Sequence, residues 1–192
     1  MAKPVEAGGS AARRAWLEAG FAILAAEGER GLTIERLCER MKKTKGSYYH
    51  HFRSPEDFAD ALLEHWAASF TEQVIHRAGQ APDARRRWRA LVREVAGLDG
   101  GVERAMRRWA AGSEAVRRRV REVDERRIGY LAELNRATGF AGRAAELARI
   151  EYAAWLGMEQ LAEDAPAAEM ERVAVRIHAL LHRSVLHKGA RR

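Results

Sequence analysis

The sequence predicts an all-α protein of about nine helices, and three observations support this fold class. Ala, Leu, Arg and Glu, which are strong helix formers, dominate the 192 residues, and only four prolines interrupt them. Hydrophobic residues make up 47% of the chain and charged residues 32%, a mixture typical of helices with one apolar and one solvated face. No run of alternating β-branched residues is long enough to predict a strand.

The first predicted helix covers residues 11–27. Leu17, Phe21 and Leu24 fall on one of its faces, and Gly28 stands where a glycine commonly ends a helix. The polar, glycine-rich residues 1–10 before it are expected to be mobile.

Two short helices are predicted next, joined by a tight turn. The first begins after Thr33, which suits the N-cap position, and the second begins at Thr44 and ends near His51. The first carries an apolar stripe at helical spacing, formed by Ile34, Leu37, Cys38 and Met41. Two helices of this size and order are typical of a helix-turn-helix, whose second helix lies in the DNA major groove.

The fourth predicted helix runs over 54–77 and begins with three N-terminal signals. Ser54 suits the N-cap, Pro55 fits the first helical turn, and Asp57 can complete a capping box. We expect this helix to link a DNA-binding head, residues 11–53, to a helical body, residues 54–187. Glycine and proline breaks separate the remaining predicted helices, which cover 84–96, 102–111, 114–137, 141–162 and 168–186.

Positive charge is concentrated around the predicted turn. The formal net charge is +7, and the window from Arg40 to Arg53 contains no Asp or Glu. Its basic residues are Arg40, Lys42, Lys43, Lys45 and Arg53, and His50 and His51 add partial charge. This distribution favours contact with nucleic-acid phosphates.

The motif Thr44-Lys45-Gly46-Ser47-Tyr48-Tyr49-His50-His51-Phe52, set between residues 32–38 and 54–58, resembles the TetR family of bacterial transcriptional regulators. The motif match covers about Arg13–Leu63. The rest of the chain is similar to the family in helix number and length, and Arg108-Trp109-Ala110 and Asp124-x-x-Arg127 resemble one TetR subgroup.

The resemblance implies roles for the matched residues. Tyr48 and Phe52 would pack inside the motif, while Tyr49 and His50 would mainly contact phosphates. The full set expected at DNA is Thr33, Lys42, Lys43, Thr44, Lys45, Gly46, Ser47, Tyr49 and His50. Lys42 replaces the glycine usual in the family's turn, and a lysine at a positive φ costs on the order of 1 kcal/mol. Lys43 replaces a small apolar residue.

Two further sites are expected in the body. An effector cavity lined by aromatic side chains would use Trp66, Phe70, Trp88, Met106, Trp109 and Tyr152, although the same residues could simply fill the core. A homodimer interface on the last two helices would use Ile150, Ala153, Ala154, Gly157, Leu161, Val173, Ile177, Leu180 and Leu181.

These features together predict a repressor that binds a near-palindromic operator as a homodimer and is released by a small-molecule effector. One alternative is an activator or DNA binder that needs no ligand, and another is an all-α interaction module that does not bind DNA. We find no nucleophile elbow or phosphate loop, so no enzymatic activity and no cofactor are predicted.

Several residues have plainer interpretations. Cys38 lies on an apolar stripe and is interpreted as a core residue rather than a redox sensor. His178 and His182, four residues apart, could bind a metal, but surface or interface histidines are favoured and no metal is predicted. The arginine runs at 85–87 and 117–119 are interpreted as solvated helix faces. The single cysteine and the absence of an apolar stretch of about 20 residues favour a cytoplasmic protein without a membrane partner.

Replacing both Lys42 and Lys43 with Ala tests whether the turn contacts DNA. The slope of log binding constant against log salt should fall by about one for each phosphate that the protein no longer neutralises, while sequence preference stays the same. Titrations of one DNA duplex at several salt concentrations measure this slope. An unchanged slope would mean that both lysines face away from DNA.

Overall fold

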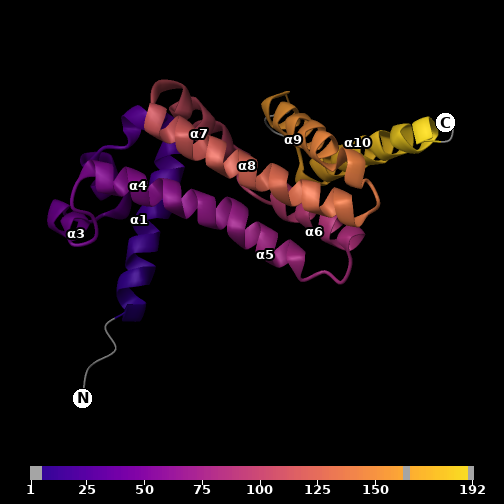
Figure 1. Ribbon diagram of the computed structural model, residues 1–192. Helices are drawn as coiled ribbons and strands as arrows, with labels where there is room; N and C mark the ends of the chain where they lie inside the picture. Colours follow the sequence, from indigo (N-terminus) through magenta and orange to yellow (C-terminus); the bar gives the residue numbers. More distant parts are fainter. Residues whose placement is uncertain (1–5, 162–164, 190–192) are drawn as a thin grey trace, which may run out of the picture. The chain divides into compact units, whose positions relative to one another are not determined.

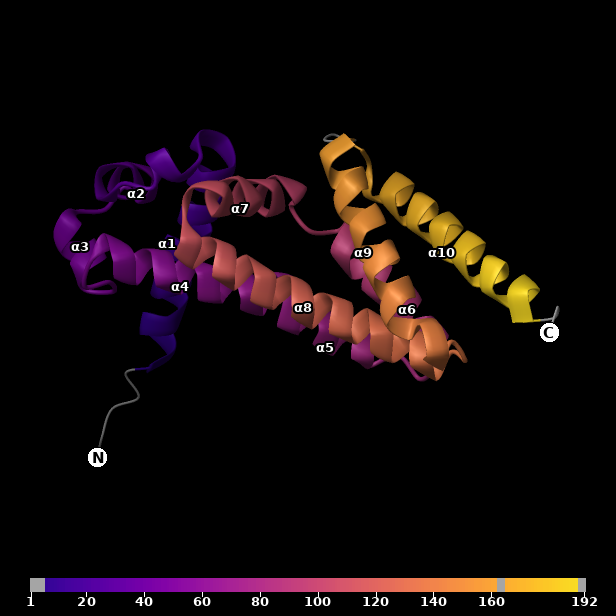
Figure 2. The ribbon, with the colours of Figure 1, turned by 45° about the horizontal axis from the view of Figure 1, so that its top comes forward.

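The computed structural model describes residues 6–161 and 165–189, which contain helices and no strand (Figures 1 and 2). The predicted all-α fold class is therefore confirmed. The longer elements are α1 (Glu6–Glu27), α2 (Ile34–Met41), α3 (Lys45–Tyr49), α4 (Pro55–Ala67), α5 (Gln73–Gly79), α6 (Ala84–Ala96), α7 (Gly100–Gly112), α8 (Glu114–Ala137), α9 (Ala144–Leu161) and α10 (Ala167–Gly189). Short elements are η1 (Glu29–Gly31), η2 (Ala68–Glu72) and η3 (Ala141–Arg143). Within the described ranges, no helix has the length and apolar character required to cross a membrane.

The described residues divide by their internal contacts into two compact units. The first contains the chain up to Ala68 together with Gly101–Val120, and the second contains Ser69–Gly100 and the chain from Arg121 onward. The predicted boundary between head and body, after residue 53, stays a prediction.

In the first unit, α1 packs against both α2 and α4, and α2 contacts α3 (Figure 2). The core includes Leu24, Leu37 and Leu62, all essentially inaccessible to solvent. Gly20 lets α1 approach α4 closely, because a Cβ there would lie 2.7 Å from Cζ of Phe58. Gly28 ends α1 with φ 74°, as the sequence predicts.

The caps predicted for α2, α3 and α4 are present. The side chains of Thr33, Thr44 and Ser54 accept hydrogen bonds from the amides three residues later, at 3.2, 3.3 and 3.1 Å. The carboxylate of Asp57, however, accepts from the amide of Arg53 at 2.8 Å, one residue before the N-cap predicted for a capping box.

The turn between α2 and α3 has the geometry that glycine usually provides. Lys42 has φ 52° and ψ 45°, and it is the one non-glycine residue of positive φ in the described chain. The amide of Lys43 donates to the carbonyl of Cys38 at 2.9 Å, and that of Lys42 to Glu39 at 3.1 Å. These two bonds form a Schellman motif. Compared with a glycine at this position, Lys42 therefore adds strain to the turn without changing its shape.

Two predicted helices differ from the structure, one in where it begins and one in its internal form. The helix predicted over 11–27 begins at Glu6, so residues 6–10 belong to it; residues 1–5 lie outside the described residues. The helix predicted over 54–77 contains a π-helical segment, η2, and α5 then extends to Gly79. Wider π turns leave carbonyls available, and Arg127 donates to the carbonyl of Phe70 at 3.4 Å and to Thr71 Oγ1 at 2.9 Å.

In the second unit, α6 contacts α5 and α10, and α10 also packs against α9. Figure 2 shows α9 and α10 as two long helices that follow one another in the chain. The core of this unit gathers Trp88 and Val92 from α6 with residues of α8 and α9, among them Leu134, Ala148 and Tyr152.

Replacing Lys42 with Gly is expected to stabilise the protein by about 1 kcal/mol, because glycine adopts a positive φ without steric cost. The midpoint of thermal unfolding should rise by roughly 2–4 °C. Lys43→Gly is the matched control and should lower stability, because Lys43 has no positive φ to relieve. A lower midpoint for Lys42→Gly would contradict the strain assigned to this turn.

Candidate nucleic-acid interface

The short helix α3 is held in place by one buried tyrosine. Tyr48 is 0% exposed, and its ring lies 5.7 Å from the ring of Trp16, 5.3 Å from Phe52 and 5.9 Å from Phe58. Its hydroxyl donates to the carbonyl of Ser54 at 3.2 Å, and burial raises its pKa to about 12. The predicted packing of Tyr48 and Phe52 is confirmed, while Trp16 was not singled out by the sequence pattern.

The side chains expected at DNA lie on the outside of this unit. Tyr49 is 53% exposed, next to the fully buried Tyr48. Ser47 is half-buried. The remaining expected residues are exposed: Thr33, Lys42, Lys43, Thr44, Lys45, Gly46 and His50. The hydroxyls of Thr33 and Thr44 also serve as helix caps, so each has a structural role in the unbound protein.

Acidic side chains from outside the basic window pair with two of its bases. Lys45 is bound to Glu35 of α2, and this hydrogen bond raises the pKa of Lys45. Arg53 Nη2 lies 3.2 Å from Asp57 Oδ1. Exposed pairs of this kind contribute little to stability because water screens them, so a phosphate can compete for either base. The basic window contains no acidic residue in the sequence, but in the structure acidic side chains from outside it neutralise part of its charge.

The histidines of the motif differ in their surroundings. His51 is half-buried beside Phe52, at a ring distance of 6.3 Å, and burial lowers its pKa. It therefore carries less positive charge than the sequence suggests, whereas His50 is exposed. Cys38 is half-buried, and burial raises the pKa of its thiol, which agrees with its interpretation as a core residue.

Gly46, in the first turn of α3, has no packing reason to be a glycine. A Cβ at this position would meet no atom nearer than Thr44 Oγ1 at 3.7 Å, an ordinary van der Waals distance. Its φ is not positive.

The residues expected to line an effector cavity are divided between the two units. Trp66, Met106 and Trp109 belong to the first, and Phe70, Trp88 and Tyr152 to the second. Trp66 and Met106 are fully buried, and Trp88 and Tyr152 nearly so. A single cavity lined by all six stays a prediction.

Each unit contains a buried glutamate that sequence reasoning missed. In the first, Trp66 Nε1 donates to Glu103 at 3.1 Å, and Glu103 also pairs with Arg107 at 3.0 Å. In the second, Trp88 Nε1 donates to Glu151 Oε2 at 3.1 Å. The tryptophans stood out in the sequence, but their carboxylate partners lie 37 and 63 residues further along the chain.

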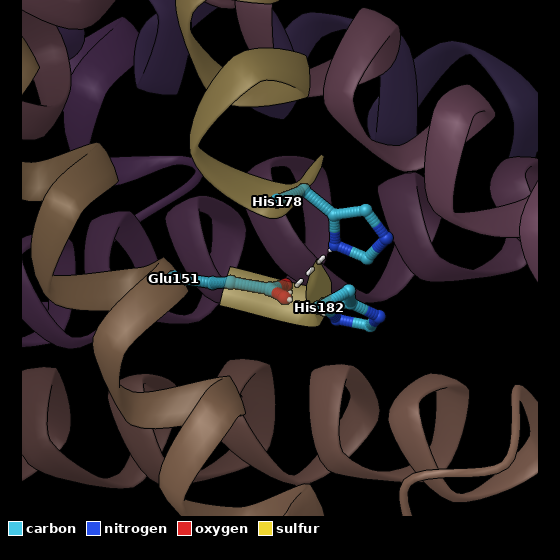
Figure 3. Close-up of side chains that lie close together, drawn as sticks. All are labelled: Glu151, His178 and His182. Atoms are coloured by element: carbon cyan, nitrogen blue, oxygen red, sulfur yellow. Dashed lines mark hydrogen bonds and ion pairs between the residues drawn. The ribbon is translucent and has the colours of Figure 1, made fainter. Parts of the chain in front are cut away.

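Glu151 also pairs with both histidines of α10. His178 Nδ1 lies 2.9 Å and His182 Nε2 lies 3.2 Å from Glu151 Oε1 (Figure 3). Burial by itself would raise the pKa of Glu151, but the hydrogen bonds of His178, His182 and Trp88 lower it to about 2.

A second polar group surrounds Tyr152. Its hydroxyl donates to Asp124 Oδ1 at 2.6 Å, and Arg127 Nη1 lies 3.3 Å from the same hydroxyl. Asp124 and Arg127 are the residues of the Asp-x-x-Arg pattern noted in the sequence, and they meet at one tyrosine.

None of the nine residues expected at the dimer interface is fully buried within the chain. Ile150, Leu161 and Leu180 are 40%, 90% and 55% exposed. Ala153 is exposed as well, and the others are half-buried: Ala154, Gly157, Val173, Ile177 and Leu181.

Several solved structures of transcriptional regulators are similar to this chain. A putative regulator of the TetR/AcrR family superposes with a TM-score of 0.75 at 22% identity, covering 88% of this chain and 99% of that one. NemR of Escherichia coli, in its reduced form, gives 0.72 at 22% identity over 86% and 94% of the two chains. A TetR-family regulator of Streptomyces coelicolor gives 0.72 at 20% identity over 91% and 89%. No protein-family model matches the sequence. No curated protein matches it either. These likenesses establish the TetR fold.

Tyr48 and Tyr49 form a matched pair for testing how α3 is built. Tyr48→Ala should destabilise the protein by about 3–5 kcal/mol, because it leaves a cavity where four aromatic rings meet. Tyr49→Ala removes an exposed ring and should cost less than about 1 kcal/mol. Chemical denaturation followed by circular dichroism measures both values. Equal losses in the two variants would contradict the assignment of Tyr48 as the residue that fixes α3.

Proposed function

We propose that this chain, which has the fold of TetR-family regulators, is a transcriptional regulator whose α3 binds the major groove of double-stranded DNA. The observation that carries the proposal is that α3 has one buried side chain that fixes it and exposed side chains beside it. Tyr48 is buried and fixes the helix, while Lys45 and Tyr49 beside it are exposed. A rigid helix with exposed cationic and hydroxyl groups suits both phosphate contact and the reading of base edges.

Gly46 supports the same function from a different direction. Because neither packing nor φ requires a glycine there, the protein alone gives no reason for a residue that weakens a helix. Close approach of the helix backbone to DNA would be a reason for this glycine, since a side chain would hold the two surfaces apart.

Selection from a random pool of DNA duplexes tests the proposal and does not require a known operator sequence. The purified protein should enrich a sequence with two related half-sites about one helical turn apart. Lys45→Ala should then weaken binding by roughly tenfold and reduce its salt dependence. Gly46→Ala should also weaken binding, while its thermal stability stays the same or rises.

Arg85→Ala is the matched control. It also removes one positive charge from an exposed helical position, but in α6 rather than in the head. Its affinity for the selected DNA should equal that of the unmodified protein. Failure to enrich any sequence would favour the interaction module that does not bind DNA, and equal losses for Lys45→Ala and Arg85→Ala would point to non-specific charge.

A homodimer formed through α9 and α10 completes the proposal. The apolar side chains of Ile150, Leu161 and Leu180 are exposed on these two helices, and Val175 is 39% exposed on α10. Apolar surface gathered on two helices is typical of a covered interface. Two copies joined there would present two heads to the two half-sites of a near-palindrome.

The combined substitution Ile150→Glu and Leu180→Glu should therefore convert a dimer into a monomer. Light scattering after size exclusion should give twice the chain mass of 21.6 kDa for the unmodified protein and a single mass for the variant. Gln73→Glu, an exposed substitution on α5, should leave the dimer intact. A double variant that stays dimeric would place the interface elsewhere.

Release by an effector is the finer part of the proposal. The polar group of Asp124, Arg127 and Tyr152, set among apolar residues of the second unit, resembles the few oriented polar groups of small-molecule sites. An effector can act only through a difference in affinity between DNA-competent and DNA-incompetent states. A compound that binds this unit without changing DNA affinity would contradict the mechanism and favour a ligand-independent regulator.

A further inference from the structure

Three metal-ligating side chains meet between α9 and α10 in the second unit. Glu151 comes from α9, while His178 and His182 are one helical turn apart on α10 (Figure 3). Each of the three residues offers one ligand atom, and these atoms all lie within 4.8 Å of one another. The cluster is distinct from the DNA-binding head, and nothing in the proposed function uses it.

The distances suit a tetrahedral ion. With metal–ligand bonds of about 2.0–2.1 Å, two ligand atoms of a zinc tetrahedron lie about 3.3 Å apart. The two nitrogen–oxygen distances here, 2.9 and 3.2 Å, are slightly shorter than this value. Small rotations of the two imidazoles relative to the carboxylate would lengthen both distances to the value that an ion requires.

The surroundings of the cluster are those of an oriented metal site. Trp88 Nε1 donates to Glu151 Oε2 at 3.1 Å, leaving Oε1 directed toward the histidines. The Trp88 ring stacks on His178 at 3.9 Å, and Phe140 lies 4.1 Å from the ring of His182. The hydrogen bond to the carboxylate and the aromatic rings around the histidines restrict the orientation of all three side chains.

We propose that Glu151, His178 and His182 bind one divalent transition-metal ion, with Zn²⁺ the best match to two imidazoles and one carboxylate. Three protein ligands leave the fourth tetrahedral position to water or to an exogenous donor. Because the ligands come from both helices, the bound ion ties α9 to α10. The alternative is that the histidines serve only as hydrogen-bond partners of a buried carboxylate.

Zinc titration of the full-length chain, purified without a histidine tag and stripped with a chelator, tests the site. Competition with a chromophoric chelator should show one Zn²⁺ bound per chain. Substitution by Co²⁺ should give the intense visible absorption of four-coordinate cobalt. At a free Zn²⁺ concentration about 100 times the dissociation constant, the unfolding midpoint should rise by roughly 5–10 °C.

Variants separate the site from adventitious binding. His178→Ala, His182→Ala and Glu151→Gln should each raise the dissociation constant at least tenfold, and Trp88→Phe, which removes the donor to the carboxylate and shortens the ring stacked on His178, by roughly tenfold. His76→Ala, an exposed histidine on α5, is the matched control and should bind as the unmodified protein does. Circular dichroism identifies variants that remain folded, and Glu151→Gln keeps the side-chain shape should an alanine variant unfold.

Two results would overturn the proposal. One is a folded, unmodified protein that binds no stoichiometric Zn²⁺, which would leave the cluster as a hydrogen-bonded part of the core. The other is binding that survives in the three ligand variants. Neither result bears on DNA binding by the head, so this inference and the proposed function can fail independently.

Discussion

The burial of Tyr48 is the constraint on which the rest of the head depends. A helix of five residues is far too short to be stable by itself, because too few hydrogen bonds offset the cost of nucleation. Tyr48 provides what α3 lacks, since its ring packs against Trp16 of α1, Phe52 and Phe58 of α4. The orientation of α3 is therefore set by helices that precede and follow it, and its opposite face stays exposed for a partner.

The fold pairs some of the positive charges around α3 with carboxylates. Glu35 and Asp57 pair with Lys45 and Arg53, so the unbound head satisfies part of its own positive charge. Because such exposed pairs are weak, DNA in the proposed complex would replace the carboxylates with phosphates at little cost. Lys42 stands in the position of strained φ, so its backbone conformation bears on stability, while its charge would bear on the proposed DNA contact.

Local signals in the sequence predicted the caps and several helix ends of the head. The N-caps at Thr33, Thr44 and Ser54, the apolar stripe of α2 and the glycine after α1 each depend on residues close in the chain, and each appears in the structure. Contacts between distant residues could not be read in this way. The π turn at η2 carries no glycine or proline to mark it, and Glu151 meets His178 and His182 from another helix, 27 and 31 residues away. The spacing of the two histidines is visible in the sequence. Their carboxylate partner, however, could be identified only once the packing of α10 on α9 was known.

Reading of DNA by α3 from the major groove is tested most directly by methylation interference on a duplex that the protein has selected. Methylation of guanine N7 lies in the major groove and that of adenine N3 in the minor groove. We expect N7 methylation to abolish binding at two sets of positions about one helical turn apart, while N3 methylation has little effect there. Interference confined to adenine N3, or none at either atom, would contradict binding of α3 in the major groove.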